Sequence, residues 1–105
     1  MTHQTEHTVK CWPEYYDAIE RGEKPFDVRR DDRDYQRGDI LRLQKYKIGY
    51  GYFTDPKGGR FSTQEIRREI TYVLTGGQFG IEPGYVVLGL KPRAGGEIAQ
   101  ERKDG

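Results

Sequence analysis

A short stretch of the chain combines cations and carboxylates of the types that bind anions and move protons. Lys24 and Arg29 are suited to hold a phosphate or to polarise a carbonyl group. Arg33 offers a planar fork that stacks on a base or pairs with an anion at two points. Asp27 and Asp32 can fix these cations or accept a proton.

The same stretch also fits a purely structural role. Asp27 and Arg29 are two residues apart, so on a strand they share one face. Acidic residues alternate with arginines from Asp31 to Asp34. Such side chains can neutralise one another in an internal web of salt bridges. The residues alone leave both interpretations open.

Basic and aromatic residues are interleaved in residues 40–68, which carry seven basic and two acidic side chains. Cations bind phosphates and aromatic faces stack on unpaired bases, so Lys45, Tyr46 and Arg60 suit single-stranded nucleic acid. The alternative is that the cations are solvated on outward strand faces while the aromatic residues pack in the core.

Other kinds of site have little support in the sequence. His3, His7 and Cys11 are four residues apart but lack a fourth ligand, so we expect no metal site. The glycine-rich pieces lack the Gly-Lys-Ser/Thr ending of a phosphate loop. We therefore expect no cofactor, and Cys11 is interpreted as a small buried residue.

Length and composition predict one small domain stabilised by its own core. The chain has 105 residues, of which 33% are hydrophobic and 33% charged, and a net charge of +1. It shows neither an apolar run that could cross a bilayer nor a signal peptide, and its single cysteine fits a reducing compartment. We expect a cytoplasmic protein that makes no contact with a membrane.

The patterning predicts a small α+β fold. Pro13 and Gly22 bound a short helix, and strands are expected near residues 9–12, 26–29, 40–47, 70–74 and 85–90. In the second of these strands Phe26 and Val28 should face inward. About five strands and one N-terminal helix should form a barrel, because closure removes exposed edges. The expected domain is 8–92, with a flexible leader at 1–7 and a disordered tail at 93–105.

Two signatures resemble a known family. The first signature is Gly22-x-Lys24-x-Phe26-x-Val28-Arg29, and the second is Asp32-Arg33-Asp34-Tyr35-x-x-Gly38-Asp39. Together they are similar to ASCH domains of the PUA-like superfamily. They look closest to a group of uncharacterised proteins known as DUF3850. The resemblance implies a PUA-like β-barrel whose helix covers one opening. It also implies a cleft, lined by residues 24–33, that binds RNA or a nucleotide-like ligand.

Some ASCH proteins hydrolyse N4-acylated cytidines with a lysine, a threonine and a glutamate. Lys24 matches that lysine, Asp27 stands at the position of the threonine, and Glu69 is a candidate for the glutamate. The resemblance therefore leaves open a small hydrolase in which these three residues are catalytic. Asp27 has no hydroxyl nucleophile, so the residues do not decide whether the chain is an enzyme.

Our first expectation is a nucleic-acid-binding module, most consistent with RNA, whose partner is RNA, single-stranded nucleic acid or a nucleoside. A hydrolase acting on a modified nucleoside is the alternative. A phage or mobile-element accessory protein that binds a host protein through the tyrosine-rich residues 46–53 is a third. The oligomeric state is open. The predicted nucleic-acid contacts are Lys24, Arg29, Asp32, Arg33, Lys45, Tyr46 and Arg60.

Overall fold

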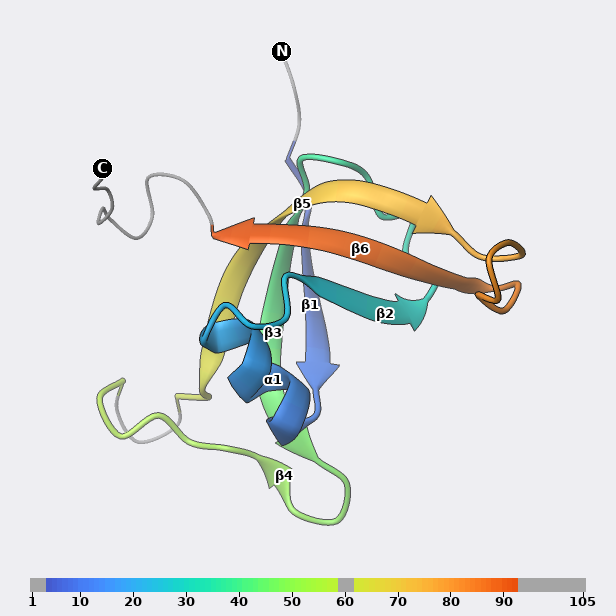
Figure 1. The fold of residues 1–105 in the computed structure, drawn as a ribbon. Coiled ribbons are helices and arrows are strands. Elements are labelled where there is room, and N and C mark those ends of the chain that lie inside the picture. Colours follow the sequence, from blue (N-terminus) through green and yellow to red (C-terminus); the bar gives the residue numbers. More distant parts are fainter. Residues whose placement is uncertain (1–3, 59–61, 93–105) are drawn as a thin grey trace.

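The computed structural model describes residues 4–58 and 62–92. They form one mixed sheet and one short helix, which confirms the α+β prediction (Figure 1). The elements are β1 (Glu6–Cys11), α1 (Pro13–Glu20), β2 (Phe26–Arg30), β3 (Ile40–Lys47), β4 (Gly51–Tyr52), β5 (Glu65–Thr75) and β6 (Tyr85–Pro92). The predicted tail and Arg60 lie outside the described residues.

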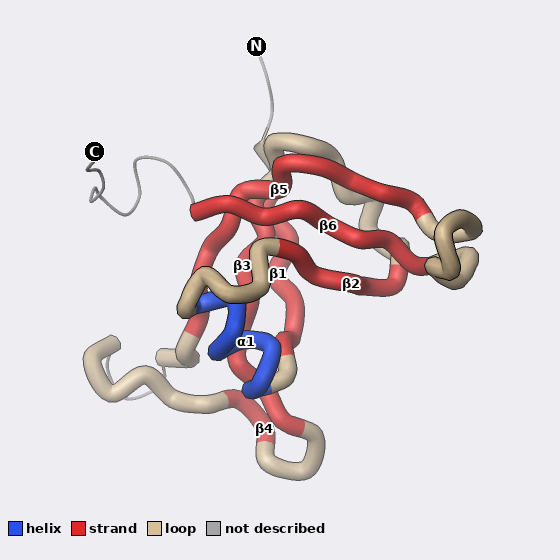
Figure 2. The backbone as a smooth tube through the Cα atoms, in the orientation of Figure 1, coloured by secondary structure: helices blue, strands red, loops and turns tan. Residues whose placement is uncertain are grey.

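The sheet is strongly curled but does not close. Its strand order is β1-β3-β5-β6-β2, with β4 added to β3, and within the described residues β1 and β2 are its two unjoined ends. Only β1 and β3 pair in parallel. The expected barrel closure is therefore wrong, because side chains and not a backbone ladder cross from β2 to β1, as described below. Figure 2 shows that the curl of the sheet brings β2 beside β1.

The long strand β5 produces the curl. Its first half, from Glu65, pairs with β3, and its second half pairs with β6. The register shifts between Ile70 and Tyr72, and such a bulge bends a strand and increases its twist. The sequence predicted only residues 70–74, because the alternation of charged residues before Ile70 conceals the earlier half. The expectation that 70–74 and 85–90 are central strands is confirmed.

The helix α1 covers the core at β3. Pro13 occupies the first turn, where its missing N–H needs no partner, and Gly22 follows the helix at φ +83°. Tyr16 and Ile19 are buried. They pack with a cluster of other buried side chains: Val9, Cys11, Tyr35, Leu41, Leu43, Ile70, Val86, Leu88 and Leu90.

The faces of β2 are the reverse of those expected. Phe26 and Val28 are 41% and 52% exposed, whereas Asp27 is buried. Arg29 pairs with the core residue Val86 and so shares the inward face with Asp27. This register is tolerated because the two inward side chains neutralise each other and because β2 lies at the open edge of the sheet.

Strand β1 begins two residues inside the predicted leader. His7 is buried, and its Nε2 lies 2.8 Å from Asp39 Oδ2. Asp39 also accepts hydrogen bonds from the backbone N–H groups of Thr5 and Gln36. This carboxylate fixes the start of β1 against the turn before β3, so Glu6 and His7 belong to the domain. No helix in the described part of the chain is long and apolar enough to span a membrane.

Candidate functional site

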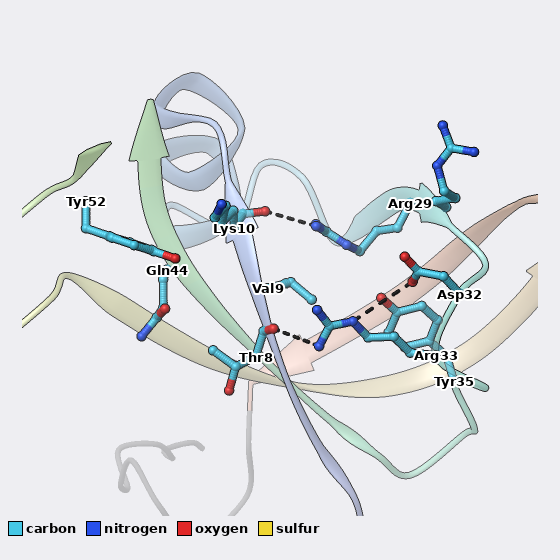
Figure 3. Close-up of a pocket in the computed structure, with 10 residues that line it drawn as sticks. Thr8, Val9, Lys10, Arg29, Asp32, Arg33, Tyr35, Gln44 and Tyr52 are labelled. Carbon is cyan, nitrogen blue, oxygen red and sulfur yellow. Dashed lines mark hydrogen bonds and ion pairs between the residues drawn. The ribbon is translucent and has the colours of Figure 1, made fainter. Parts of the chain in front are cut away.

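Two arginines bridge the open ends of the sheet. Arg29 Nη2, on β2, donates to the carbonyl oxygen of Lys10 at 3.0 Å. Arg33 Nη1, in the loop that follows, donates to the carbonyl oxygen of Thr8 at 2.9 Å. Figure 3 shows both guanidinium groups reaching toward β1. We call this junction between β1 and β2 the seam. At the seam, guanidinium N–H groups donate to carbonyl oxygens of β1 that a neighbouring strand would otherwise bind.

The seam contains two adjoining cavities. The first has a volume of about 330 Å³ and is lined by Thr8, Val9, Lys10, Arg29, Arg30, Asp32, Arg33, Tyr35, Gln44 and Tyr52. The second has a volume of about 380 Å³ and is lined by Lys10, Cys11, Trp12, Tyr15, Asp27, Val28, Arg29, Arg30 and Tyr85. Lys10, Arg29 and Arg30 border both, so the Lys10–Arg29 bridge divides one continuous depression.

A buried carboxylate organises the cations on the β2 side. Asp27 Oδ2 accepts from Arg29 Nη1 at 2.7 Å, and Asp27 Oδ1 lies 3.3 Å from Lys24 Nζ. Lys24 Nζ also donates to the carbonyl oxygen of Phe26 at 3.0 Å and lies over the Tyr15 ring. Lys24 is thus occupied by protein groups, and it is absent from the lining of both cavities.

Arg29 is held firmly as a cation. Burial lowers the pKa of its guanidinium, but the charge and hydrogen bond of Asp27 outweigh burial and raise the pKa above its ordinary value. The Tyr35 hydroxyl is a further hydrogen-bond partner of Arg29, and burial raises the pKa of that hydroxyl. The positive charge in the seam is therefore permanent at any physiological pH.

Cys11, which lines the second cavity, is not an activated nucleophile. Burial raises the pKa of its thiol to about 12, and the negative charge of Asp27 adds to this effect. A thiol reacts as its thiolate, and here that form is suppressed at neutral pH. The sequence interpretation of Cys11 as a buried residue is confirmed, since 3% of it is exposed.

Three of the predicted nucleic-acid contacts and one residue of the predicted catalytic trio meet at the seam. Arg29, Asp32 and Arg33 line the first cavity, and Asp27 lines the second. Arg33 is 45% and Asp32 58% exposed in their side chains, so a ligand can reach both. Lys24 lies behind them, attached to Asp27.

Other predicted residues lie elsewhere. Lys45 Nζ pairs with Asp17 Oδ1 of the helix at 3.0 Å and is largely buried, so it anchors α1 to β3. Tyr46 packs against Trp12 and Tyr52, with Lys10 Nζ 4.5 Å from its ring centre. Tyr46 therefore touches the residues of the seam without lining a cavity.

Glu69 does not join Lys24 and Asp27. It lies on β5 between the inward residues Arg68 and Ile70, so it projects from the outer face, and its nearest cation is Lys91 at 3.9 Å. Asp27 points to the inner face of the same sheet. The catalytic trio considered from the sequence is therefore not assembled.

Ion pairs neutralise part of the positive charge of residues 40–68. Arg42 Nη2 lies 3.0 Å from Glu65 Oε1, and Arg67 Nε lies 3.1 Å from Glu6 Oε1. Lys45 also forms an ion pair, with Asp17. The aromatic residues do not pack in the core as the alternative interpretation expected, since Tyr50 and Tyr52 are 67% and 45% exposed.

Sequence reasoning missed Lys10, Arg30 and Gln44, which also line the first cavity. No local pattern indicates that residues 10 and 30 become neighbours. Within residues 4–58 and 62–92 no group of three or more His, Cys, Asp or Glu side chains is placed to hold a metal ion.

Comparison with known proteins places the chain in a family. The model of DUF3850, a domain of unknown function, matches residues 6–90. The chain belongs to the DUF3850 family. A segment of 43 residues is also 40% identical to an uncharacterised 12.9 kDa protein in the GpA 3' region of Escherichia phage P2. That match covers 41% of this chain and 39% of the phage protein.

Proposed function

We propose that this DUF3850 protein is an ASCH-like, PUA-like module that binds single-stranded RNA along the seam. The observation that carries the proposal is the lining of the first cavity, where Lys10 and three arginines surround a space with Asp32 as the only acidic side chain. Charged donors converging on a small open cavity suit a phosphate group.

The arginine that bridges to Thr8 is suited to exchange partners. The side chain of Arg33 is half exposed, and one of its N–H groups donates to the neutral carbonyl oxygen of Thr8. In a hydrogen bond from arginine to a phosphate oxygen both the donor and the acceptor are charged, so it is stronger than a hydrogen bond from arginine to a carbonyl oxygen. RNA binding would replace the Arg33–Thr8 bond, while Arg29 stays in place through Asp27.

Asp32 gives a reason to favour RNA over DNA. Its carboxylate is exposed beside Arg33 and accepts hydrogen bonds only. A ribose 2'-hydroxyl group can donate to it, whereas deoxyribose offers no such donor.

The test is fluorescence polarisation with a labelled single-stranded 12-mer of RNA and its DNA counterpart over a range of salt concentrations. Affinity should fall with salt, and Arg33→Ala should reduce the magnitude of the log–log slope by about 0.7, the release expected for one phosphate contact on a single strand. Arg21→Ala, which removes an exposed cation at the end of α1, should leave the slope unchanged. Absence of salt-sensitive binding to either strand overturns the proposal.

Hydrolysis of an N4-acylated cytidine is the second candidate, favoured by the contact between Lys24 Nζ and the buried carboxylate of Asp27 next to the second cavity. A lysine beside a carboxylate can move a proton during amide hydrolysis. N4-acetylcytidine should then yield cytidine and acetate, and Lys24→Ala should abolish the turnover. No release of acetate by the unaltered protein removes this candidate.

Binding of a host protein is the third candidate. Ile48 and Tyr50, in the β3–β4 loop, are 72% and 67% exposed, and Ile48 borders an apolar cavity of about 420 Å³ with Trp12 and Pro13. Exposed apolar and aromatic side chains suit protein interfaces. A pull-down that retains one defined protein after nuclease treatment, and loses it with Ile48→Ser, would support this function. Retention that ceases with nuclease treatment contradicts it.

A further inference from the structure

The outer face of β2, β6 and β5 is an apolar surface that no other element of the described chain covers. Its side chains form rows across the three strands, since Phe26 pairs with Gly89 and Gly89 with Tyr72, and Val28 pairs with Val87 and Val87 with Leu74. We call it the aromatic face, and it consists of Phe26, Val28, Tyr72, Leu74, Tyr85 and Val87. Phe26, Val28 and Tyr72 are 41%, 52% and 56% exposed. A contiguous exposed apolar patch of this kind is typical of a binding surface.

Each ring of the aromatic face has a cation above it. Lys24 Nζ lies 4.7 Å from the ring centre of Phe26, the guanidinium carbon of Arg30 lies 5.4 Å from that of Tyr85, and that of Arg37 lies 5.8 Å from that of Tyr72. These three cations come from different segments of the chain. Asp27 compensates the charge of Lys24, so the positive charge at the rim of the apolar face comes from Arg30 and Arg37, whose guanidinium planes extend its stacking surface.

The aromatic face is continuous with the seam. Val28 and Tyr85 border the second cavity as well as the aromatic face, and Arg30 borders both cavities. A strand whose phosphates contact Arg33 can therefore pass Arg30 and reach the aromatic face without leaving the protein surface.

We propose that the aromatic face holds unpaired bases of the same RNA strand whose phosphates lie in the seam. The inference rests on the proposed function and makes it specific to unpaired bases, because bases in a duplex cannot stack on protein rings. Phe26 and Tyr72 lie on either side of Gly89 in the register, so their rings border the same row of the aromatic face.

Charge favours this occupant over a second copy of the chain. Two aromatic faces in contact would bring Arg30 and Arg37 of one molecule close to the same cations of the other. Like charges at an interface oppose association, whereas a nucleic acid supplies bases for the rings and phosphates for the cations.

The experiment compares an intact single-stranded 12-mer RNA with an abasic 12-mer of the same backbone. Both present the same phosphates, so the ratio of their dissociation constants isolates the bases. The unaltered protein should bind the intact strand roughly tenfold or more tightly, the effect of stacking one or more bases. Tyr72→Leu, which keeps an apolar side chain and loses the ring, should reduce the ratio several-fold, and Tyr72→Phe should keep it. Tyr50→Ala removes an even more exposed ring outside the aromatic face and is the control.

The outcomes separate the two proposals. Salt-sensitive binding with equal affinity for intact and abasic strands overturns the aromatic face and leaves the seam standing. No binding of either strand overturns both. Sedimentation tests whether the face instead joins two copies of the chain. If Tyr72→Leu dissociates a dimer and leaves the ratio of dissociation constants unchanged, the face is a self-association surface and the inference is wrong. A salt slope that is unchanged in Tyr72→Leu, together with the reduced ratio, supports it.

Discussion

At the scale of single residues, Asp27 decides how the seam is built. Its buried carboxylate accepts from Arg29 and contacts Lys24, so one anion compensates two cations in a partly dry environment. Removal of one member of such a group leaves uncompensated charge, which costs far more than the intact group contributes. Asp27 is thus a positioning residue whose role is to hold Arg29 in the orientation that reaches β1.

Asp27→Asn should lower the free energy of unfolding by about 3 kcal/mol, because Arg29 and Lys24 lose their shared counter-charge while partly buried. Urea unfolding followed by circular dichroism measures the change. Glu23→Gln breaks the exposed pair with Arg21 and should leave the unfolding midpoint unchanged. Equal effects of the two substitutions would contradict a special role for Asp27.

Cys11 makes the protein sensitive to alkaline pH. Its thiol has a pKa of about 12 when folded against an ordinary value of 9.0, so the folded state keeps a proton that the unfolded chain releases. The stabilisation is fully present below pH 9 and is lost as the pH rises toward 12, at up to about 1.4 kcal/mol per pH unit. In Cys11→Ala this part of the loss should vanish between pH 9 and 10 in urea unfolding. Parallel curves for the two proteins would show that another group causes the loss.

At the scale of elements, β1 depends on two kinds of support. One edge pairs with β3 over residues 6–11, and the other is held by guanidinium groups. An exposed strand edge is a liability that proteins cover in different ways, and here arginine side chains cover it while leaving cavities for a ligand. The same donors therefore stabilise β1 and supply the proposed binding site.

Arg29→Lys should loosen β1 locally. A lysine keeps the charge next to Asp27 but lacks the fork that reaches Asp27 and the Lys10 carbonyl oxygen together. Hydrogen exchange of the Val9 and Cys11 amides should accelerate on the order of tenfold, in keeping with the loss of one charged hydrogen bond. Exchange at Val86, in the interior strand β6, is the internal control. A uniform acceleration over the whole sheet would mean that the seam is not an independent unit.

At the scale of the whole molecule, an ion-pair network ties the first strand to distant parts of the chain. Glu6 contacts Arg67, and Glu65 contacts Arg42 and Arg67, all on the outer face of β1, β3 and β5. These pairs join residues up to 61 positions apart. They engage two of the seven cations of the central segment, whereas the first cavity of the seam is lined by four cations and one carboxylate.

The network should contribute to stability against acid. Burial raises the pKa of Glu65, but hydrogen bonds from Arg42 and Gln44 outweigh it and hold the pKa below its ordinary value of 4.5. The contribution is present above pH 4.5 and is lost as the pH falls below it. Glu65→Gln should therefore cost up to about 1 kcal/mol at pH 7 and progressively less below pH 4.5 in urea unfolding. Glu82→Gln, in the β5–β6 turn, serves as the control. A cost that does not vary with pH would exclude the ion pairs as its origin.

Local sequence determined most of the elements and part of the candidate site. Pro13, Gly22 and the alternating apolar residues define the helix and strands, because caps, turns and periodicity depend only on near neighbours. The signature around Arg29 and Arg33 indicated the family and the residues of the seam.

Only the tertiary structure decided which faces and partners these residues have. Alternation in β2 does not state which side is inward, and the buried pair of Asp27 and Arg29 reversed the apolar expectation. Contacts between distant segments decide three further features. Lys10 and Arg30 border the same cavities, Glu69 projects from the other face, and the sheet remains open. Strand pairing and register set those contacts, and neither is encoded within a short window of sequence.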